Sequence, residues 1–482
     1  MHSLYKYKPL ARIRQRTRWK RRYYKAKYDP YKRKNPIANM KTPNVFDYEL
    51  WPYRAEVVII GGGLTGSATA FWLKQRLRVE DWTVTVIESP SKFDMSRSLL
   101  STGIITQQFS VPEFVEMSLF TSEFLRHAGE HLQIEDNDPP DINILPMGFM
   151  HLATTNEQAD QLQSSWKMQI EKGARVAFWT KDELEQNFPF MNFDGIVAGT
   201  YGLENEGCID TWQLLAALRE KNITLGVTYL KGEVEGFQYR RATTDYTFAD
   251  IHGTVDTEEA DSEIHSRKQL TGVIVRPEMH CASARPIQAY RIVNAAGPWA
   301  GDIAEMAGIG KGPGLMSVPV PIKKRKRTTF LIHAPDCPDL LDMPAFFDPS
   351  GVFCRPNDMG YNFVCGRVPT KEEDRFINHD DLTVDYNEFY EKVWPVLVKR
   401  IPLFKNVKVI NGWAQLNDVN VYDDAPLLGE HLKHFSLYTM AGFGSYGPQM
   451  AIAAGRAYSE RHYDDAYTSV NLRKFDMRRI MH

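Results

Sequence analysis

Two glycine-rich turns of similar form lie near opposite ends of this chain, and they constrain its fold more than any other feature. The first spans residues 61–66 (GGGLTG) and the second spans 442–447 (GFGSYG). Each follows a strand-like run and precedes a helix-like run. In that context a G-x-G-x-x-G turn presents backbone N–H groups to a phosphate or to another part of a nucleotide cofactor. The pair predicts one binding site built from both ends of the chain.

The surroundings of the first turn match a dinucleotide-binding βαβ unit. The run 56–60 is apolar and β-branched, as in a buried parallel strand, and 64–77 is expected to be helical. Gly61, Gly63 and Gly66 allow the sharp turn, the approach of a pyrophosphate and helix–strand packing. A second strand over 83–87 ends in Glu88, an acid placed to bind an adenosine ribose. A tight turn without a ligand is disfavoured, because strand, helix, second strand and acid are all in register.

Cysteine and hydropathy patterns exclude other classes of protein. Five cysteines are scattered and never form C-x-x-C, which argues against a disulfide framework and a zinc site, so we expect no bound metal. Residues 55–73 are almost uncharged and about as long as a membrane span. Their central glycines and threonines fit a strand–turn–helix better, and we expect no transmembrane segment. At 482 residues the chain is long enough for two or three ordinary domains, or for two domains braided together.

A strongly basic N-terminal arm precedes an acidic body. Residues 1–41 contain 15 Lys or Arg and one acid, Asp29, whereas the rest of the chain has 43 basic and 59 acidic residues. Three interpretations remain open. A mitochondrial transit peptide fits the basic, acid-poor composition but not the scarcity of serine, a nucleic-acid-binding arm fits the interleaved aromatic residues, and a disordered solvated tail fits the charge alone. We expect no secretory signal, because no apolar run follows the basic stretch.

Two further segments are expected to reach the same site. The loop 96–103 (SRSLLSTG) follows the second strand on the carboxyl side of the sheet, so its hydroxyls are candidates for contacts with a ribityl chain or pyrophosphate; an ordinary serine-rich turn is the alternative. A strand-like run at 290–294 leads into AAGPWA at 295–300, where small residues again allow close approach. Only 35 residues follow Gly447, too few for a second nucleotide-binding domain. The second turn must therefore complete a site begun elsewhere.

These motifs resemble, in the same order, those of the D-amino-acid oxidase superfamily of flavoproteins, which includes sarcosine oxidase and dimethylglycine dehydrogenase. The match rests on 57–66, 293–300 and 441–447, with 207–210 (GCID) and its following helix as a further landmark. Within this family, 101–110 and 392–395 resemble a mitochondrial member that is associated with assembly of respiratory complex I. The resemblance favours the transit-peptide interpretation and a location in the mitochondrial matrix or on the matrix face of the inner membrane.

The resemblance implies an α/β fold with a discontinuous Rossmann-like FAD-binding domain braided with a mixed-sheet (α+β) substrate domain. After a basic arm over 1–50, the FAD-binding domain is expected to comprise 54–140, 205–310 and 405–470, with a polar insertion at 242–268. The substrate or cap domain is expected to comprise 141–204 and 311–404.

The resemblance also assigns cofactor contacts. The first turn and its acid would hold the pyrophosphate and ribose, the serine-rich loop the ribityl path, the strand after Gly226 the adenine, and the later segments the flavin. The helix after the second turn would direct its N–H groups at the pyrimidine side of the flavin, where reduced flavin is anionic. In chain order the candidates are Gly61, Gly63, Leu64, Thr65, Gly66, Glu88, Ser98, Ser101, Thr102, Gly103, Val234, Ala296, Gly297, Trp299, Gly444, Ser445, Tyr446, Gly447 and Pro448.

Departures from the family pattern complete the expectations. Relatives with covalent flavin carry His in the loop at 99–101 or Cys in the segment at 413–417, and this chain carries neither, so FAD is expected to be non-covalent. Many members have Gly-His-Gly in the second turn, where this chain has Tyr446. Tyr446 and Arg355 are the catalytic candidates. A tyrosine is a poor base near neutral pH unless its pKa is strongly lowered, and Arg355, with Arg367 as second choice, would bind a substrate carboxylate.

Two functions remain open at the level of sequence. The chain is either an FAD-dependent oxidoreductase that removes a hydride from the carbon next to the nitrogen of a small amine or amino-acid-like substrate, or a flavin-stabilised factor with little turnover that contacts respiratory complex I subunits or assembly factors. Neither function requires a nucleic-acid partner. An NAD-dependent dehydrogenase is disfavoured by the short segment after the second turn.

Overall fold

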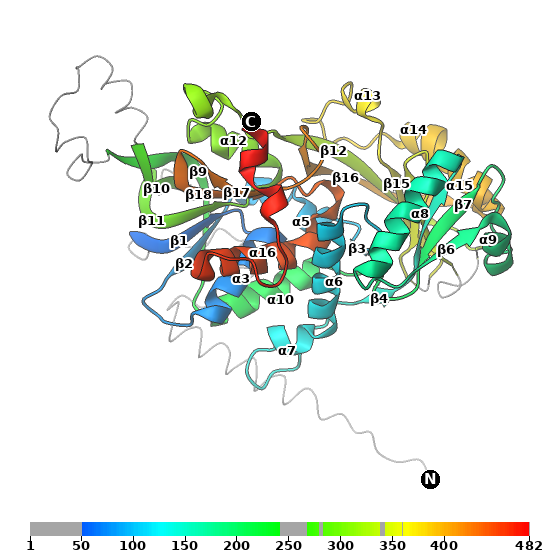
Figure 1. The fold of residues 1–482 in the computed structure, drawn as a ribbon, viewed down its shortest axis with the longest axis horizontal. Helices are drawn as coiled ribbons and strands as arrows, with labels where there is room; N and C mark the ends of the chain where they lie inside the picture. The colour runs from blue at the N-terminus through cyan, green and yellow to red at the C-terminus, as the bar shows by residue number, and fades with distance from the viewer. Residues whose placement is uncertain (1–50, 242–267, 279–282, 338–342, 359, 482) are drawn as a thin grey trace, which may run out of the picture.

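The computed structural model describes residues 51–241, 268–278, 283–337, 343–358 and 360–481. Two large sheets lie toward opposite ends of the long axis of the molecule, with helices packed around them (Figure 1). A short three-stranded sheet comprises β3 (Ile104–Ile105), β8 (Gly207–Cys208) and β4 (Leu145–Pro146). The expected basic arm, and the expected insertion except for residue 268, lie outside the described residues.

The seven-stranded sheet has the parallel core expected of a dinucleotide-binding domain. Five strands run parallel in the order β9-β2-β1-β11-β18, while β10 pairs antiparallel with β9 and β11, and β17 pairs antiparallel with β18. The strands are β1 (Arg54–Ile60), β2 (Val84–Glu88), β9 (Thr228–Arg241), β10 (Lys268–Pro277), β11 (Arg285–Asn294), β17 (Leu427–His431) and β18 (His434–Ala441).

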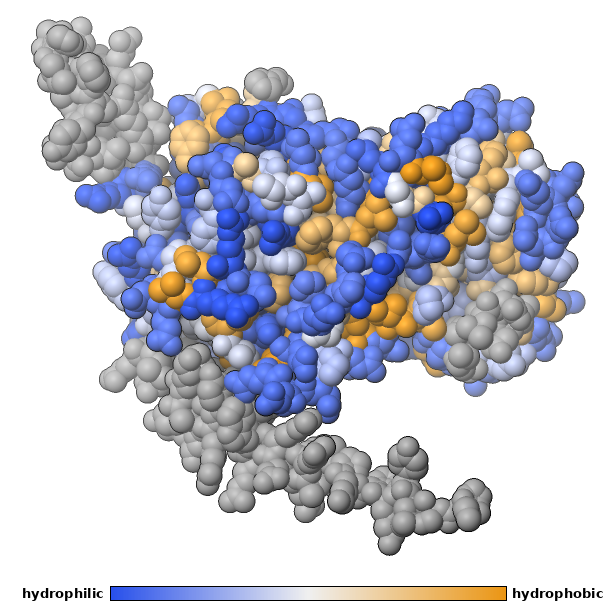
Figure 2. Space-filling view, turned by 60° about the horizontal axis from the view of Figure 1, so that its bottom comes forward, coloured by the Kyte–Doolittle hydropathy of each residue, from blue (hydrophilic) through white to orange (hydrophobic). Residues whose placement is uncertain are grey.

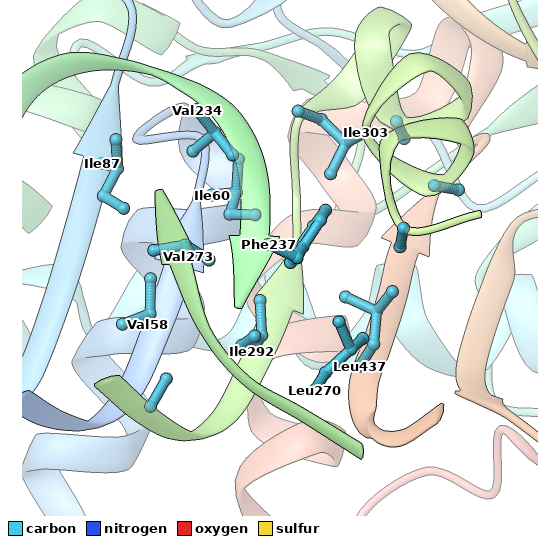
Figure 3. Close-up of a cluster of buried hydrophobic side chains, with 14 of the residues drawn as sticks. Val58, Ile60, Ile87, Val234, Phe237, Leu270, Val273, Ile292, Ile303 and Leu437 are labelled. Carbon is cyan, nitrogen blue, oxygen red and sulfur yellow. The ribbon is translucent and has the colours of Figure 1, made fainter. Parts of the chain in front are cut away.

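Apolar layers cover both faces of this sheet, which explains why its central strands read as continuous hydrophobic runs. One face packs against α3 (Leu64–Arg76) and α16 (Gly447–Asp464), and α10 (Thr211–Thr224) packs on α3. Figure 3 shows the other face, where Val58 and Ile292 of the parallel core meet Phe237 and Leu270 of the β9–β10 hairpin. The apolar stretch 55–73 is divided between β1 and α3. No helix among the described residues has the length and apolarity needed to cross a bilayer.

The eight-stranded sheet is mixed, as expected for the substrate domain. Its order is β16-β12-β15-β14-β13-β5-β7-β6, with β13 and β5 parallel and the other neighbours antiparallel. The strands are β5 (Phe149–Ala153), β6 (Val176–Thr180), β7 (Ala198–Gly202), β12 (Ile322–His333), β13 (Ala345–Phe347), β14 (Val352–Pro356), β15 (Asn362–Arg367) and β16 (Lys408–Asn420).

One expected boundary needs correction. The segment 405–470 was assigned to the FAD-binding domain, but β16 is the edge strand of the eight-stranded sheet, where it pairs along the whole of β12. The crossing between the two sheets therefore lies after residue 420. The physical reason is that β16 contacts both sheets. Isolated β-bridges join its Leu416 to Ser96 in the serine-rich loop and its Val419 to Phe443 in the second glycine turn.

The remaining helices pack around and between the two large sheets. Hydrophilic side chains dominate the face shown in Figure 2, and apolar residues gather in patches near its middle. These helices are α4 (Pro90–Phe93), α5 (Arg97–Leu100), α6 (Pro112–Arg126), α7 (Ala128–Leu132), α8 (Asn156–Glu171), α9 (Lys181–Asn187), α12 (Ala300–Met306), α13 (Lys371–Asp374), α14 (Tyr386–Glu388) and α15 (Trp394–Arg400).

Candidate cofactor site

A pocket of about 910 Å³, measured to its open mouth, lies at the carboxyl ends of β1, β2 and β11. That is where ligands bind in open α/β sheets. The two glycine turns line this one pocket, although most of the chain separates them. The sequence-predicted residues in its lining are Gly61, Gly63, Leu64, Thr65, Glu88, Ser98, Val234, Ala296, Gly297, Trp299, Gly447 and Pro448.

The first turn is shaped by three contacts that leave no room for a side chain. Gly61 has φ +104°, and a Cβ there would lie 2.3 Å from the carbonyl oxygen of Ala295. A Cβ at Gly63 would lie 2.7 Å from the hydroxyl of Ser98, which accepts a hydrogen bond from the Leu64 amide at 3.0 Å. A Cβ at Gly66 would lie 1.9 Å from the Gly61 carbonyl oxygen. The turn is thereby pressed against β11 and α5, with the N-terminus of α3 at the pocket wall.

Glu88 lies at the end of β2 and lines the pocket, as predicted. Its Oε2 atom accepts a hydrogen bond from the Gly62 amide at 2.7 Å, which ties the acid to the first turn. Burial raises the pKa of Glu88 to about 7, while the Arg219 guanidinium and the amides of Gly62 and Ser89 oppose that shift. The carboxyl group therefore changes its charge within the physiological pH range.

The second turn is held by a buried carboxylate that sequence reasoning did not single out. Asp418 of β16 accepts hydrogen bonds on Oδ2 from the Gly442 amide at 2.7 Å and the Phe443 amide at 3.0 Å. Gly442 has φ +91° and Gly444 has φ +54°, conformations that favour glycine. The chain then enters α16 at Gly447, and its N-terminal end faces the pocket.

Arg97 is the most informative pocket residue that sequence reasoning missed. It is 9% exposed, and its Nε and Nη1 atoms have no hydrogen-bond partner among the residues that the structure describes, while Nη2 donates to the carbonyl oxygen of Ser445. Burial lowers its pKa to about 10, so it stays charged at neutral pH. A buried cation with unused donors is costly to a protein unless a ligand supplies acceptors. Its signal in the sequence was its place between two serines of a loop already predicted to bind the cofactor.

The pocket residues fit FAD. One end of the pocket presents the first glycine turn to a pyrophosphate, and the other end presents the N-terminus of α16 to the anionic side of a flavin. Arg97 adds N–H donors that have no acceptor among the described residues. No cysteine or histidine is among the residues that line it. Over the same described residues, no cluster of three or more His, Cys, Asp or Glu side chains is arranged to hold a metal ion.

Several predicted contacts lie behind or beside the pocket lining. Gly66 lies beneath the turn, and Ser101 accepts a hydrogen bond from the Gly103 amide at 3.1 Å. The other predicted residues outside the lining are Thr102, Gly444, Ser445 and Tyr446. These residues belong to the loops behind the pocket lining. Gly103 is also outside the lining: it has φ +68°, and a Cβ there would lie 2.0 Å from the Ile209 carbonyl oxygen.

One face of the eight-stranded sheet contacts the cofactor loop. The cross-strand register joins His151, Phe347, Phe353, Gly366, Thr329 and Trp413 in one row. Two side chains on this face bond to the loop from the first sheet. Trp413 Nε1 donates to the Leu100 carbonyl oxygen at 2.9 Å, and Arg355 Nε donates to the Thr102 carbonyl oxygen at 2.9 Å.

The two catalytic candidates differ in their surroundings. Arg355 is 7% exposed and donates Nη1 to Pro356 and Asn357 oxygens, but no described carboxylate forms an ion pair with it. Its alternative, Arg367, is already paired with Glu373 at 2.8 Å. Tyr446 packs edge-on against Phe109 with ring centroids 5.0 Å apart and remains 42% exposed, and an ordinary tyrosine pKa lies far above neutral pH. Tyr446 is thus a hydrogen-bond donor at neutral pH and not a base.

The fold and this pocket define a flavin-dependent oxidoreductase of the amino-acid oxidase type. Comparison with known families agrees: the model described as FAD dependent oxidoreductase matches residues 56–461, and the chain belongs to this family. The family member that residues 101–110 and 392–395 were expected to resemble is FAD-dependent oxidoreductase domain-containing protein 1, and this resemblance is confirmed. The chain is 37% identical to bovine (Bos taurus) FAD-dependent oxidoreductase domain-containing protein 1 over 428 residues, which are 88% of this chain and 84% of the bovine protein.

Solved structures confirm the fold class. L-Proline dehydrogenase from P. horikoshii superposes with a TM-score of 0.67 at 21% identity, over 88% of this chain and 97% of that protein. Glycine oxidase from Geobacillus kaustophilus superposes with a TM-score of 0.65 at 20% identity, over 88% of this chain and 98% of that protein. At these identities the likeness concerns the fold.

Proposed function

We propose that this protein binds FAD non-covalently and oxidises a small amine or amino-acid-like substrate by removing a hydride from the carbon next to the nitrogen. The observation that carries the proposal is Arg355, a buried guanidinium without a carboxylate partner among the described residues, on the sheet face that bonds to the cofactor loop. The names of the structural neighbours, L-proline dehydrogenase and glycine oxidase, support an amino-acid-like substrate. A pocket lining without cysteine or histidine supports non-covalent binding.

Bound FAD supplies the hydride acceptor, and the protein supplies orientation and electrostatics. Arg355 binds the substrate carboxylate and fixes which carbon faces the cofactor. The N-terminal N–H groups of α16 stabilise negative charge at the second turn. Tyr446 donates a hydrogen bond from its neutral hydroxyl. Because no basic side chain occupies the second turn, the substrate nitrogen enters the site in its deprotonated form, and its proton is lost to solvent.

Replacement of Arg355 tests the substrate site. Anaerobic mixing with a panel of amino acids and N-methyl amino acids is expected to bleach the flavin absorbance of the wild-type protein. R355M is expected to retain FAD and weaken the response to a carboxylate substrate by about 30-fold or more, because a buried charge pair is lost. R367M is the matched control and is expected to leave the response unchanged, since Glu373 already occupies Arg367. Failure of every substrate to bleach bound flavin contradicts oxidation of this substrate class.

We also propose that the protein is mitochondrial and lies in the matrix or on the matrix face of the inner membrane. As a second candidate function, we propose that the protein, stabilised by its flavin, takes part in the assembly of respiratory complex I. The basic, acid-poor segment 1–41 supports the location, and the lack of a basic side chain in the second turn, where Tyr446 stands, favours weak turnover. In cells that lack the protein, R355M is expected to restore complex I as well as wild type if assembly needs only the folded flavoprotein. A chain whose segment 1–50 is removed is expected to stay outside mitochondria.

A further inference from the structure

Arg219 of α10 lies directly beneath the first glycine turn, and the cofactor contacts assigned above do not include it. Its side chain is 1% exposed. Nε and Nη2 both donate to the carbonyl oxygen of Gly62, at 3.2 and 2.5 Å, and Nη2 lies 3.5 Å from Oε2 of Glu88. The amide of the same residue donates to that Oε2 atom at 2.7 Å. The N–H and the C=O of Gly62 are therefore both held by the Arg219–Glu88 ion pair.

A second layer fixes Arg219 in this place. Its guanidinium lies over the ring of Phe93 at 4.2 Å. Ser67 donates its hydroxyl to the Gly62 carbonyl oxygen at 3.0 Å and accepts one from the Tyr229 hydroxyl at 3.1 Å. Asn222, one turn further along α10, donates to the Tyr229 hydroxyl at 2.8 Å. Helix α10 and strand β9 thus hold the turn through side chains, in addition to its backbone contacts.

We propose that Arg219 is a positioning residue for the adenosine end of the cofactor: it clamps the Gly62 peptide and places a positive charge beside Glu88, so that the carboxylate is ionised and oriented to accept hydrogen bonds from the ribose hydroxyls. This inference rests on FAD binding and is independent of any substrate turnover.

The charges around Glu88 support a pH-dependent role. Burial raises the pKa of Glu88 to about 7 even with Arg219 in contact. The other charged groups at this end of the pocket, Lys92 and Glu233, form an ion pair with each other, and Tyr229 has a raised pKa and stays neutral. An ionised carboxylate accepts two ribose hydroxyls, whereas the protonated form has lost acceptor capacity. FAD affinity is therefore weaker below about pH 7, where Glu88 is protonated, and rises as pH passes through this value.

The test measures the FAD dissociation constant of the flavin-stripped full chain as a function of pH. Wild-type affinity is expected to increase up to about tenfold per pH unit below pH 7 and to level off above it. In R219M the rise is expected to move upward by about one pH unit or more, because the cation that favours ionised Glu88 is gone. E88Q is expected to bind more weakly with no rise. R219K is expected to restore the wild-type midpoint in part, and R76M, a surface control at the far end of α3, to leave it unchanged.

A uniform loss of affinity in R219M with the wild-type midpoint would overturn the proposal, because it would mark Arg219 as a packing residue only. Calorimetry of the wild type gives a readout that does not need R219M to fold. FAD binding near pH 6.5 is expected to release a fraction of a proton, measured in buffers of different ionisation enthalpy, and E88Q is expected to release none. Equal proton release in both proteins also overturns the proposal. A wild type that binds no FAD at any pH instead contradicts the cofactor assignment itself.

Discussion

Alanine at Gly66 is expected to abolish FAD binding and to destabilise the protein by about 3 kcal/mol or more. The new Cβ would lie 1.9 Å from the Gly61 carbonyl oxygen and 3.1 Å from the Ile59 side chain. The first contact is with backbone at the centre of the turn, so relief requires α3 to move away from β1. Such a movement displaces the N–H groups that face the pocket. Flavin absorbance of the purified variant and its free energy of unfolding in urea measure the two effects.

Gly236→Ala is the matched control for this substitution. Gly236 lies within β9, where a Cβ would only touch the Ile274 side chain at an ordinary 3.8 Å. This variant is expected to bind FAD and to unfold like the wild type. A G66A protein that is yellow and as stable as G236A would show that the turn relaxes without cost, in conflict with the geometry described.

Replacement of Arg97 is expected to separate cofactor binding from stability. R97M should weaken FAD binding by about tenfold or more, because two N–H donors that the protein leaves unused are lost from the pocket. The flavin-free protein is expected to lose little stability, because the substitution removes a costly buried cation but also the donor to the Ser445 carbonyl oxygen and the positive charge near Asp418. Titration with FAD and unfolding of the flavin-free chain measure the two effects.

The comparison for this prediction is Arg76→Met. Arg76 is a surface arginine of α3 that pairs with Asp464 at 2.5 Å, far along the helix from the pocket. Exposed pairs contribute little to stability, so R76M is expected to leave both quantities near wild type. An R97M protein that binds FAD as tightly as R76M would contradict a cofactor role for Arg97.

The framework of the site could be predicted from the sequence because local pattern determines it. The apolar run 56–60, the glycine spacing and the acid at the end of the next strand are consecutive features of one βαβ unit, and the structure has them as β1, α3 and β2. The start of α10 is equally local, because the side chain of Asp210 accepts hydrogen bonds from the Trp212 and Gln213 amides just after it in sequence. The second turn was more distant, but its position near the C-terminal end implied that it joins a site formed earlier.

The site residues that could not be predicted from the sequence contact partners that are far away along the chain. Asp418 reads as an ordinary polar residue in a strand, and only the folding of β16 against the second turn shows that it bonds to Gly442 and Phe443. Arg219 lies in a helix whose pattern predicts a charged residue at the surface, yet tertiary packing places it under Gly62. For the same reason the predicted domain boundary put β16 in the wrong sheet, because strand periodicity does not reveal which of two sheets a strand will join.

The division of one site between the two ends of the chain has a consequence for biosynthesis. As the ribosome releases the chain, the first turn and Glu88 emerge early, whereas Asp418 and Gly447 emerge only after most of the protein has been made. Strand β18 then inserts beside β11, a pairing between distant segments that is slow to form. A partly synthesised chain therefore has no complete pocket, and stable retention of FAD marks a chain that has been translated through α16.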